Sequence, residues 1–248
     1  MKEQIEERLK ELITSYISPL SPLKEGVEYI LLSKGKRIRP LITLLLTENH
    51  PLALDVACAI ELLHTSSLIH DDLPCMDDDD YRRGLLTLHK KYDEAHALLT
   101  GDLLMTWPYE IISSIQGLRD AQKYRLCLVL AKRFREVIEG QKLDLTQDNE
   151  GWKGIELMHE KKTAALFMAA FEAAAIINEH PLEDYSREGR RFGLAFQCYD
   201  DLLDQGPALT YFSEKDLKEH IEHLLSPVFC KFPHLDSLYP FFQEPLHV

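Results

Sequence analysis

The amino-acid sequence predicts an all-α protein with roughly ten helices packed around an apolar interior. Long stretches are rich in Ala, Leu and Met, which favour helices, and these stretches are too long for β-strands. Alternating apolar and polar runs that end in Asn-Gly or Asp-Gly turns are missing. The 248 residues, 45% of them hydrophobic, are enough for a large core. We therefore expect residues 1–248 to form a single domain.

The expected helices follow one another with helix-breaking residues between them. The first spans residues 1–17, where apolar residues recur at the i, i+4, i+7, i+8 spacing of one helix face. Further helical runs cover residues 53–72, 162–178 and 187–204, and neither a repeat nor a long linker divides the chain. The apolar residues of the first helix are Ile5, Leu9, Leu12 and Ile13, and the breakers are Pro19, Pro22, Pro40, Pro51, Gly117, Gly140, Gly151, Gly154, Pro181, Gly206, Pro207 and Pro227.

The charge and the cysteine content of the chain exclude several classes of function. The formal net charge is -13, which repels nucleic acid and anionic lipid. The five cysteines are scattered without a CxxC pair, which disfavours a disulfide framework or a zinc ribbon and favours a reducing compartment. Residues 1–17 lack the apolar core of a secretory signal, and no apolar run approaches the ~20 residues that span a bilayer. We therefore expect a cytoplasmic protein without stable membrane insertion and without a nucleic-acid partner.

An acidic cluster, HDDLPCMDDDDYRRG at residues 70–84, directly follows an apolar helical run. Pro74 cannot donate a helical hydrogen bond, so the helix should loosen just before it and leave Asp71 and Asp72 at its C-terminal end. Carboxylates are unfavourable there unless a cation is present, and Asp77 could fold back beside them. Mg²⁺ is usually held by one or two carboxylates plus substrate phosphates, and the two arginines that follow suit phosphate groups. The cluster therefore predicts metal-bridged polyphosphate binding, with a solvated acidic loop as the alternative.

A second acidic cluster lies in GLAFQCYDDLLD, residues 193–204. At about 100° per residue, Gln197, Asp200, Asp201 and Asp204 fall within one arc of a helix whose other side chains are apolar. Adjacent carboxylates on a largely buried helix cannot all stay ionised without countercharge, which metal ions would provide. The alternative is a polar stripe that faces solvent.

Two short basic segments lie where helices are expected to begin, and each is a candidate anion site. At the second segment, N-terminal amides of the helix would strengthen the binding of an anion. Taken singly, such a segment is more often a surface basic patch than an anion site. Together with the two acidic clusters, they predict two phosphorylated ligands that meet in one site. The residues concerned are Lys36, Arg37 and Arg39 in GKRIRP, and Lys161, Lys162 and Thr163 in HEKKTAALF.

These motifs resemble those of the trans-isoprenyl diphosphate synthases, the family of farnesyl and geranylgeranyl diphosphate synthases. GKRIRP is similar to the family's GGKRxRP motif, and SLIHDDLPCMDDDDYRRG to its first aspartate-rich motif in the bacterial and plastid form. GQKLDL, KTAALF and FGLAFQCYDDLLD are similar to its GQxxDL, KTxxLF and GxxFQxxDDxxD motifs, and the resemblance runs in order from about residue 2 to residue 204. It implies an isoprenoid synthase bundle around a central cavity, usually a homodimer.

The resemblance implies a short-chain prenyltransferase that condenses isopentenyl diphosphate with an allylic diphosphate, assisted by two or three Mg²⁺ ions. Mg²⁺ on the allylic diphosphate would be held by Asp71 and Asp77, with Asp72 nearby, and by Asp200, Asp201 and Asp204, and these six carboxylates form the catalytic set. The remaining residues that it assigns are Arg82, Lys162, Thr163 and Gln197 in the allylic site, and Lys36, Arg39, His64 and Arg83 in the isopentenyl diphosphate site.

Product length is expected to depend on the helix below the first acidic cluster. Ser67 lies ~6 Å and Ser66 ~7.5 Å down the helix from Asp71. Farnesyl-producing members of the family tend to carry bulky aromatic residues at one or both of these positions. Two serines leave space for a longer tail, so we expect a C20 product, geranylgeranyl diphosphate, rather than the C15 farnesyl diphosphate.

The resemblance ends after about residue 205, and the C-terminal portion is short and divergent. The family usually continues with a flexible basic loop and a lysine followed by TYP, whereas this chain reads DQGPALTYFSEKDLKE. Lys215 or Lys218 are the candidates to replace the loop lysines. A catalytically silent regulatory subunit of another prenyl synthase is therefore an alternative reading, although both aspartate motifs are present.

Two other classes of protein share single features with the chain. A di-iron carboxylate bundle would use the ExxH pairs Glu61–His64 and Glu156–His159, but it would leave both aspartate clusters unexplained. A terpene cyclase would share the first aspartate motif and would normally replace the second with an Asn/Ser/Glu pattern, which is absent from this sequence.

Overall fold

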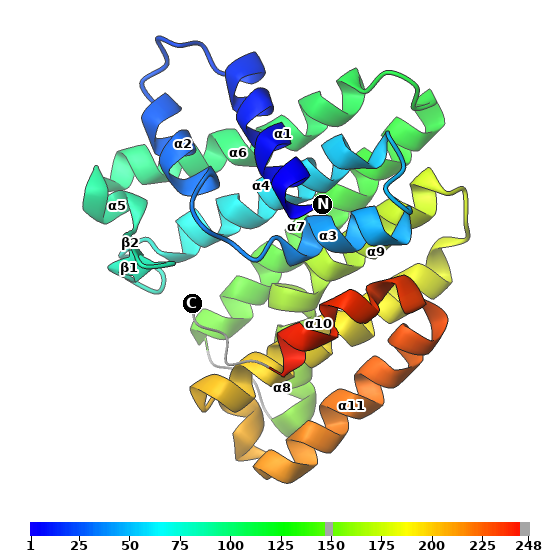
Figure 1. Cartoon of the computed structure of the whole chain (residues 1–248). Helices are drawn as coiled ribbons and strands as arrows, with labels where there is room; N and C mark the ends of the chain where they lie inside the picture. The colour runs from blue at the N-terminus through cyan, green and yellow to red at the C-terminus, as the bar shows by residue number, and fades with distance from the viewer. Residues whose placement is uncertain (147–150, 244–248) are drawn as a thin grey trace.

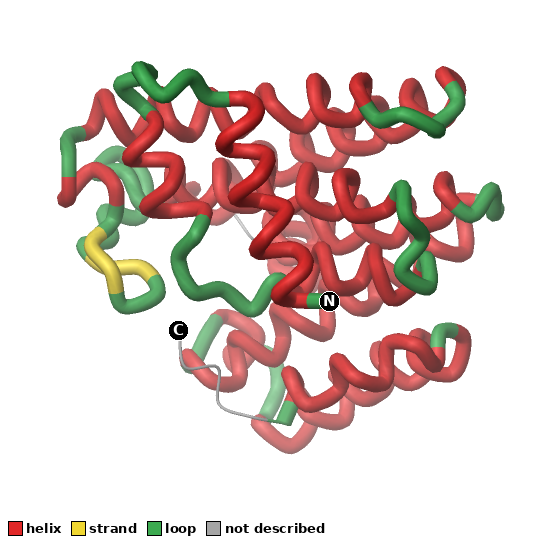
Figure 2. Tube along the Cα trace, turned by 45° about the horizontal axis from the view of Figure 1, so that its top comes forward, coloured by secondary structure: helices red, strands yellow, loops and turns green. Residues whose placement is uncertain are grey.

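The computed structural model describes residues 1–146 and 151–243, which form an all-α bundle as the sequence predicts. Figure 1 shows α1, α2 and α6 at one end of the bundle and α10 and α11 at the other, and Figure 2 shows how little of the described chain is not helical. The α-helices are α1 (Lys2–Tyr16), α2 (Lys24–Leu31), α3 (Ile38–Leu46), α4 (Ala53–Asp71), α5 (Leu88–Lys91), α6 (Glu94–Ser114), α7 (Asp120–Thr146), α8 (Gly151–His159), α9 (Ala165–Ile177), α10 (Leu182–Asp204) and α11 (Glu214–Lys231). Three shorter helical segments are η1 (Glu160–Ala164), η2 (Pro207–Thr210) and η3 (Pro233–Phe242).

Helix α9 lies at the centre of the bundle because it is almost wholly apolar, and every one of its residues is buried. It packs against α3, α4, α7 and α10. Its one charged residue, Glu172, accepts a hydrogen bond of 2.9 Å from Arg133 Nε of α7, and Arg133 also donates to Ser186 of α10 at 3.0 Å. A buried carboxylate that loses its partner costs about 3–5 kcal/mol, so removing either residue of this pair alone would strongly destabilise the core. Among the described residues, no helix is both long and apolar enough to cross a membrane.

Helix α1 is anchored on α4 by the apolar face that the sequence predicts. Arg8 grips Asp55 of α4 with two hydrogen bonds, Nε–Oδ1 at 2.5 Å and Nη2–Oδ2 at 3.1 Å. One turn further along α4, the Sγ of Cys58 is 4.0 Å from the backbone oxygen of Ile5. Residue numbers therefore fall along α1 as they rise along α4, so the two helices are antiparallel. The buried apolar residues of α1 are Ile5, Leu9, Leu12 and Ile13.

Residues 151–177 form one unbroken helical run, so the expected helix start at Lys161–Thr163 is wrong. Helix α8 passes directly into η1, a π-helical turn, and then into α9. The backbone amides of this segment lie inside a helix, and they are not the free N-terminal amides that would bind an anion. Gly140 of α7 allows the π-turn to approach closely, because a Cβ at this position would overlap the backbone of Lys162. Single π-turns of this kind are frequent at functional sites.

A small hairpin of β1 (Tyr81–Arg82) and β2 (Leu85–Leu86) is the element that the sequence prediction missed. The strands pair antiparallel, and Arg83 and Gly84 between them both have positive φ, 55° and 76°. Such a turn matches type I′, which usually contains Asn-Gly or Asp-Gly. An Arg-Gly turn is not among those signals, and a non-glycine residue at positive φ is uncommon. The hairpin holds both arginines of the first cluster in fixed positions.

The chain beyond Asp204 folds back along α10 as η2, α11 and η3. Phe242 of η3 packs edge-on against Phe192 of α10, with 5.3 Å between ring centroids, and lies 5.9 Å from Tyr199. This aromatic contact gives the C-terminal portion a place in the core that its sequence did not predict. It also fixes the outer face of the helix that carries the second acidic cluster.

Candidate active site

A cavity of about 600 Å³ opens between the loop before α3, α4, the hairpin, η1 and α10. It brings together both acidic clusters and both basic segments, which lie far apart in the sequence. The predicted site residues Ser66, Asp72, Asp77 and Asp201 do not line it. Those that do are Lys36, Arg39, His64, Ser67, Asp71, Arg82, Arg83, Lys162, Thr163, Gln197, Asp200 and Asp204.

The first acidic cluster begins at Asp71, the last residue of α4, because the helix ends before Pro74. The chain then folds back, and the backbone N–H of Asp77 donates to the carbonyl oxygen of Asp71 at 2.9 Å. Gln141 of α7 holds the Asp77 carboxylate with a hydrogen bond of 3.2 Å from Nε2 to Oδ1. The return of Asp77 towards the helix end is the arrangement that the sequence suggested.

Asp72 differs from its neighbour Asp71, because its carboxylate is buried and turned towards the hairpin. It accepts a hydrogen bond of 2.6 Å from Arg82 Nε, and Arg82 also donates to Asp79 at 3.2 Å. This charge-assisted pair fixes the Arg82 guanidinium at the cavity wall. The sequence alone did not distinguish the carboxylate that faces the cavity from the one that positions an arginine.

The second acidic cluster likewise contains carboxylates that face the cavity and one that is buried and holds another part of the protein. Asp200 and Asp204 line the cavity one helical turn apart on α10, whereas Asp201 is buried behind them. Asp201 Oδ2 accepts a hydrogen bond of 2.8 Å from the backbone N–H of Ala208, and His159 Nε2 lies 3.4 Å from the same oxygen. Asp201 therefore joins the end of α10 to η2 and keeps the helix end in place.

Gln197 connects the second acidic cluster to the π-turn. Its Oε1 accepts a hydrogen bond of 2.6 Å from Thr163 Oγ1, and its Nε2 donates to Asp201 at 3.0 Å. Lys162, next to Thr163, is paired with Asp144 of α7. The GQKLDL, KTAALF and FGLAFQCYDDLLD segments are thus joined side chain to side chain at one edge of the cavity.

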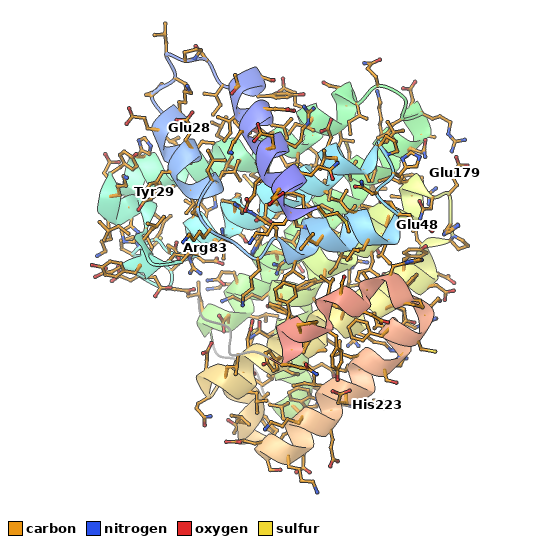
Figure 3. The ribbon with its side chains drawn as sticks, viewed as in Figure 1. Glu28, Tyr29, Glu48, Arg83, Glu179 and His223 are labelled. Atoms are coloured by element: carbon orange, nitrogen blue, oxygen red, sulfur yellow. The ribbon has the colours of Figure 1, made fainter. Side chains whose placement is uncertain are left out.

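The basic wall of the cavity is built around Arg39 and Arg83. Arg39 Nη1 lies 3.2 Å from His64 Nε2, and its guanidinium carbon is 4.3 Å from the centre of the Phe167 ring. Burial, together with the charge of Arg39, keeps the pKa of His64 well below its usual value, so the neutral ring accepts a hydrogen bond from the arginine. Arg83 Nη1 donates to Ser33 at 3.4 Å, and Figure 3 labels Arg83 between the hairpin and the loop before α3.

Arg37 lines the cavity, but its guanidinium is already paired with groups of the protein itself. It is buried and donates to Glu61 at 2.6 Å and to two backbone carbonyls near the end of α2 at 2.7 and 2.8 Å. Its φ of 55° turns the chain sharply into α3. Gly35 leaves space for this arrangement, because a Cβ there would come within 2.9 Å of Arg83 Nη1 and 3.1 Å of Arg37 Nη1.

Burial raises the pKa of two of the carboxyl groups that line the cavity, Asp71 and Asp200, to about 7. At Asp71 the positive charge of Lys162 opposes this effect and the nearby Asp77 adds to it. At Asp200 it is Lys36 that opposes the effect of burial. Without a further cation, each of these carboxyl groups is reluctant to ionise at neutral pH.

A second cavity, of about 400 Å³, adjoins the first, and Ser67 and Asp71 line both. Ser66 lies outside it, because its hydroxyl donates to the backbone oxygen of Gly101 at 2.9 Å between α4 and α6. The sequence prediction named only positions on α4 and missed the contribution of α7. Phe134, Val137, Ile138, Gln141 and Leu145 of α7 line this cavity and follow the i, i+3, i+4, i+7, i+11 spacing of one helix face. The other lining residues are His70, Met76, Met105, Phe134, Val137, Ile138, Gln141, Lys142 and Leu145.

The carboxylates of the cavity fit a metal ion that a substrate helps to hold. Within residues 1–146 and 151–243, no group of three or more His, Cys, Asp or Glu side chains is arranged to bind a metal by itself. The ExxH glutamates also have other partners, since Glu61 pairs with Arg37 and Glu156 with Arg190 at 3.3 Å, so the di-iron reading has no support. Mg²⁺ held by one or two carboxylates plus phosphate oxygens matches this donor set.

A model of the polyprenyl synthetase family matches residues 21–219, which is most of the chain. The chain belongs to the polyprenyl synthetase family. Geranylgeranyl pyrophosphate synthase 7, chloroplastic, of Arabidopsis thaliana is 39% identical over 212 residues, which are 79% of this chain and 61% of the plant protein. Farnesyl diphosphate synthase of Micrococcus luteus is 40% identical over 204 residues, 78% of this chain and 70% of the bacterial protein. The chain spans about three fifths of the length of the plant relatives that it matches.

Solved structures of similar proteins agree with the polyprenyl synthetase assignment. The geranyltransferase from Legionella pneumophila is 29% identical with a TM-score of 0.90, and the match covers 100% of this chain and 95% of that one. The geranyltransferase from Helicobacter pylori complexed with magnesium and isoprenyl diphosphate is 27% identical with a TM-score of 0.77, over 97% and 92% of the two chains. The described fold is therefore that of the family throughout.

This member of the polyprenyl synthetase family departs from the expected pattern after the second acidic cluster. Lys215 and Lys218, the candidates for the missing loop lysines, belong to α11 and do not line the cavity. Lys215 is exposed and lies 3.8 Å from Glu219 on the same helix. Neither lysine therefore covers the cavity in the way that the sequence reading suggested.

Replacing either cavity carboxyl group by an amide is expected to stabilise the metal-free protein at alkaline pH. The pKa of about 7 in the folded state exceeds the ordinary value of about 3.9, so the folded protein retains a proton that the unfolded chain loses, and stability falls as pH rises from about 4 to 7. Asn does not ionise. Asp71→Asn or Asp200→Asn should therefore raise the free energy of unfolding by about 1–3 kcal/mol at pH 8 and by much less at pH 5.

Thermal and urea unfolding in the presence of EDTA measure this effect. Asp236→Asn, which changes an exposed carboxyl group of η3 with no ion-pair partner among the described residues, is the matched control and should leave stability unchanged. An increase in stability that is the same at both pH values would contradict the assignment to ionisation.

Proposed function

We propose that the protein is a short-chain trans-prenyltransferase. It joins isopentenyl diphosphate to an allylic diphosphate by a head-to-tail 1′–4 condensation, and its product is geranylgeranyl or farnesyl diphosphate. The observation that carries this proposal is the cavity, in which carboxylates from two helices and a basic wall face one space that adjoins an apolar pocket. The names of the relatives, geranylgeranyl pyrophosphate synthase and farnesyl diphosphate synthase, support the same reaction.

Asp71, Asp77, Asp200 and Asp204 are the residues that would hold two or three Mg²⁺ ions together with the allylic diphosphate. When bound, the metal supplies positive charge that favours departure of the diphosphate. The magnesium and isoprenyl diphosphate named in the Helicobacter pylori structure support this assignment. The raised pKa of the carboxyl groups means that protons compete with the metal at acidic pH.

Four further side chains bind the allylic diphosphate in this proposal: Arg82, Lys162, Thr163 and Gln197. Each has a partner in the protein before substrate arrives. Arg82 is fixed by Asp72, and Thr163 by Gln197 at 2.6 Å. Lys162 projects from the π-turn at the same edge of the cavity. Cations and hydrogen-bond donors that are already oriented stabilise the charge that develops on the leaving group as the C–O bond breaks.

Isopentenyl diphosphate binds against the basic wall, where Lys36, Arg39 and Arg83 meet its diphosphate. Its double bond then attacks C1 of the allylic cation, a new C–C bond forms, and one proton leaves to restore a double bond. Glu61 also lines the cavity, but it is committed to Arg37, so it is not available as a base. In this proposal the departing diphosphate takes the proton.

The apolar residues of the site protect the allylic cation from water. Leu68, Leu166 and Phe196 line the main cavity between its charged walls. The second cavity receives the growing hydrocarbon tail, which enters past Ser67. Exclusion of water prevents hydrolysis of the cation and strengthens the electrostatic interactions around the diphosphates.

The activity test uses the purified protein alone. With isopentenyl diphosphate, a C5, C10 or C15 allylic starter and Mg²⁺, it is expected to release inorganic diphosphate and to form a longer prenyl chain, which chromatography of labelled product identifies. Asp71→Asn or Asp200→Asn should lower kcat about 100-fold or more, because each removes charge that acts on the leaving group. A wild-type protein that yields no product alone, but raises the activity of another prenyl synthase, would establish the regulatory-subunit alternative instead.

Ser67 is expected to control product length, because it lies where the two cavities meet. Ser67→Phe should place a ring across the tail path and shift the product from C20 towards C15 or C10, without abolishing turnover. Ser66→Ala is the matched control, since that hydroxyl faces Gly101 and not the tail pocket. An unchanged product from Ser67→Phe, measured by the same chromatography, would show that the α7 side alone sets the length.

We also propose that the protein is a homodimer, with α6 and α7 at the interface. The exposed side chains of α7 include an apolar series at heptad spacing, which suits packing against another helix. Light scattering at micromolar concentration should give twice the monomer mass, and Leu128→Glu combined with Ile138→Glu should give a monomer. The control Lys218→Glu, an exposed position on α11, should not. A wild-type monomer would overturn the proposal. The exposed apolar residues are Leu98 and Leu99 on α6, and Tyr124, Leu128, Ile138 and Leu145 on α7.

The cellular location remains the prediction made from the sequence, a cytoplasmic enzyme. Bacterial relatives such as the Micrococcus luteus synthase support it. The plant relatives are named as chloroplastic, so a plastid is the alternative location. Fluorescence microscopy of the tagged full chain in its own cells would distinguish the two locations.

A further inference from the structure

One side of the main cavity carries more positive charge than the proposed function uses. Three of its basic residues, Arg37, Arg82 and Lys162, are paired with carboxylates that belong to the protein itself. The proposed function assigns three of the remaining ones to the diphosphate of isopentenyl diphosphate and leaves two without a role. The basic residues that line the cavity without an ion-pair partner in the described part of the chain are Lys2, Lys34, Lys36, Arg39 and Arg83.

Lys2 reaches the cavity because of the way α1 lies on α4. The antiparallel register of the two helices is set by two contacts. Arg8 pairs with Asp55, and one turn further along α4 Cys58 contacts Ile5. One further turn brings Lys2 level with Glu61, which lines the same cavity. Figures 1 and 2 agree, since the first turn of α1 lies beside the loop that leads into α3.

Lys34 comes from that loop and is exposed. It directly precedes Gly35, whose lack of a side chain lets Arg83 approach the loop. The two unassigned lysines therefore lie on the same side of the cavity as the basic wall, and both have long, mobile side chains. Since the protein as a whole has a net charge of -13, this local excess of positive charge is not a general property of its surface.

We propose that Lys2 and Lys34 form an outer rim that binds the diphosphate of isopentenyl diphosphate. This inference rests on the proposed function. A diphosphate carries several negative charges on two phosphate groups, and the inner residues, Arg39 and Arg83, are held by other contacts at the wall. The rim lysines contact the phosphate group nearer the solvent and draw the anionic substrate towards the opening, against the negative charge of the rest of the protein.

Steady-state kinetics of Lys2→Ala, Lys34→Ala and the double variant test the rim. Each single change should raise the KM for isopentenyl diphosphate about two- to fivefold, the effect expected of one solvent-exposed charge, and the double variant about tenfold. The KM for the allylic substrate and kcat should stay within about twofold of wild type, because neither lysine touches the carboxylates. Added salt should reduce the difference between variant and wild type.

Lys10→Ala is the matched control, because Lys10 is exposed on the same helix, pairs with Glu7 at 3.3 Å and does not line the cavity. It should leave every kinetic constant unchanged. A KM for isopentenyl diphosphate that stays at the wild-type value in the double variant would overturn the rim. So would an equal rise in the Lys10 control, since it would assign the effect to net charge and not to position.

A binding measurement separates failure of this inference from failure of the proposed function. Isothermal titration calorimetry of wild type and the double variant with inorganic diphosphate, in EDTA and so without metal, reports on the basic wall whether or not the protein turns over substrate. The double variant should bind inorganic diphosphate about tenfold more weakly than wild type and Lys10→Ala. If wild type is inactive but this difference is found, the rim stands and the proposed reaction fails; if wild type is active and the difference is absent, the rim fails.

Discussion

Two partly buried carboxyl groups in one cavity, Asp71 and Asp200, are the constraint to which the rest of the structure is adjusted. Burial raises the pKa of each to about 7, so the fold holds them where ionisation is costly. No single cluster of side chains in the described residues completes a metal site around them. The cavity therefore reaches its most favourable charge state only when cations and phosphate oxygens arrive together. These two groups lower the free energy of unfolding of the ligand-free protein, and a ligand that binds only the folded state raises it again.

Neighbouring residues in the motifs have opposite orientations, and this division explains why the motifs contain doubled residues. Asp71 faces the cavity while Asp72 holds an arginine, and Asp200 faces it while Asp201 secures the helix end. In the basic segment both arginines line the cavity, but Arg37 is buried and paired with Glu61 whereas Arg39 has no ion-pair partner among the described residues. The supporting residues keep their neighbours in fixed positions, so less ordering is required when substrate binds. A substitution at a supporting residue is therefore expected to disturb the site without removing a ligand contact.

The helical pattern and the motif spacing predicted the fold and most of the cavity lining, because both follow from which faces are apolar. The four buried residues of α1 and the end of α4 before Pro74 are examples. What the sequence did not reveal depends on three-dimensional context. The π-turn at Lys162 lies inside a continuous helical run, and its composition does not distinguish it from a helix start. The Arg83–Gly84 turn uses a non-glycine residue, a type that rarely adopts positive φ. The two orientations within each Asp-Asp pair are likewise decided by partners from other elements.

The segment after Asp204 raises the question of whether the site is catalytic or only retained. This segment is packed against the bundle, because η2 is hydrogen-bonded to Asp201 and the C-terminal aromatic residues pack on α10. A subunit without catalytic function would lose nothing by carrying neutral side chains in place of Asp71 and Asp200, and its folded state would be more stable above pH 7. Instead, the structure keeps both carboxyl groups in the cavity, supports each with a buried neighbour, and sets unpaired basic residues beside them. Bound cations and phosphate groups would offset the cost of ionising these carboxyl groups, so the chemistry of the cavity supports the proposed catalytic role over the silent alternative.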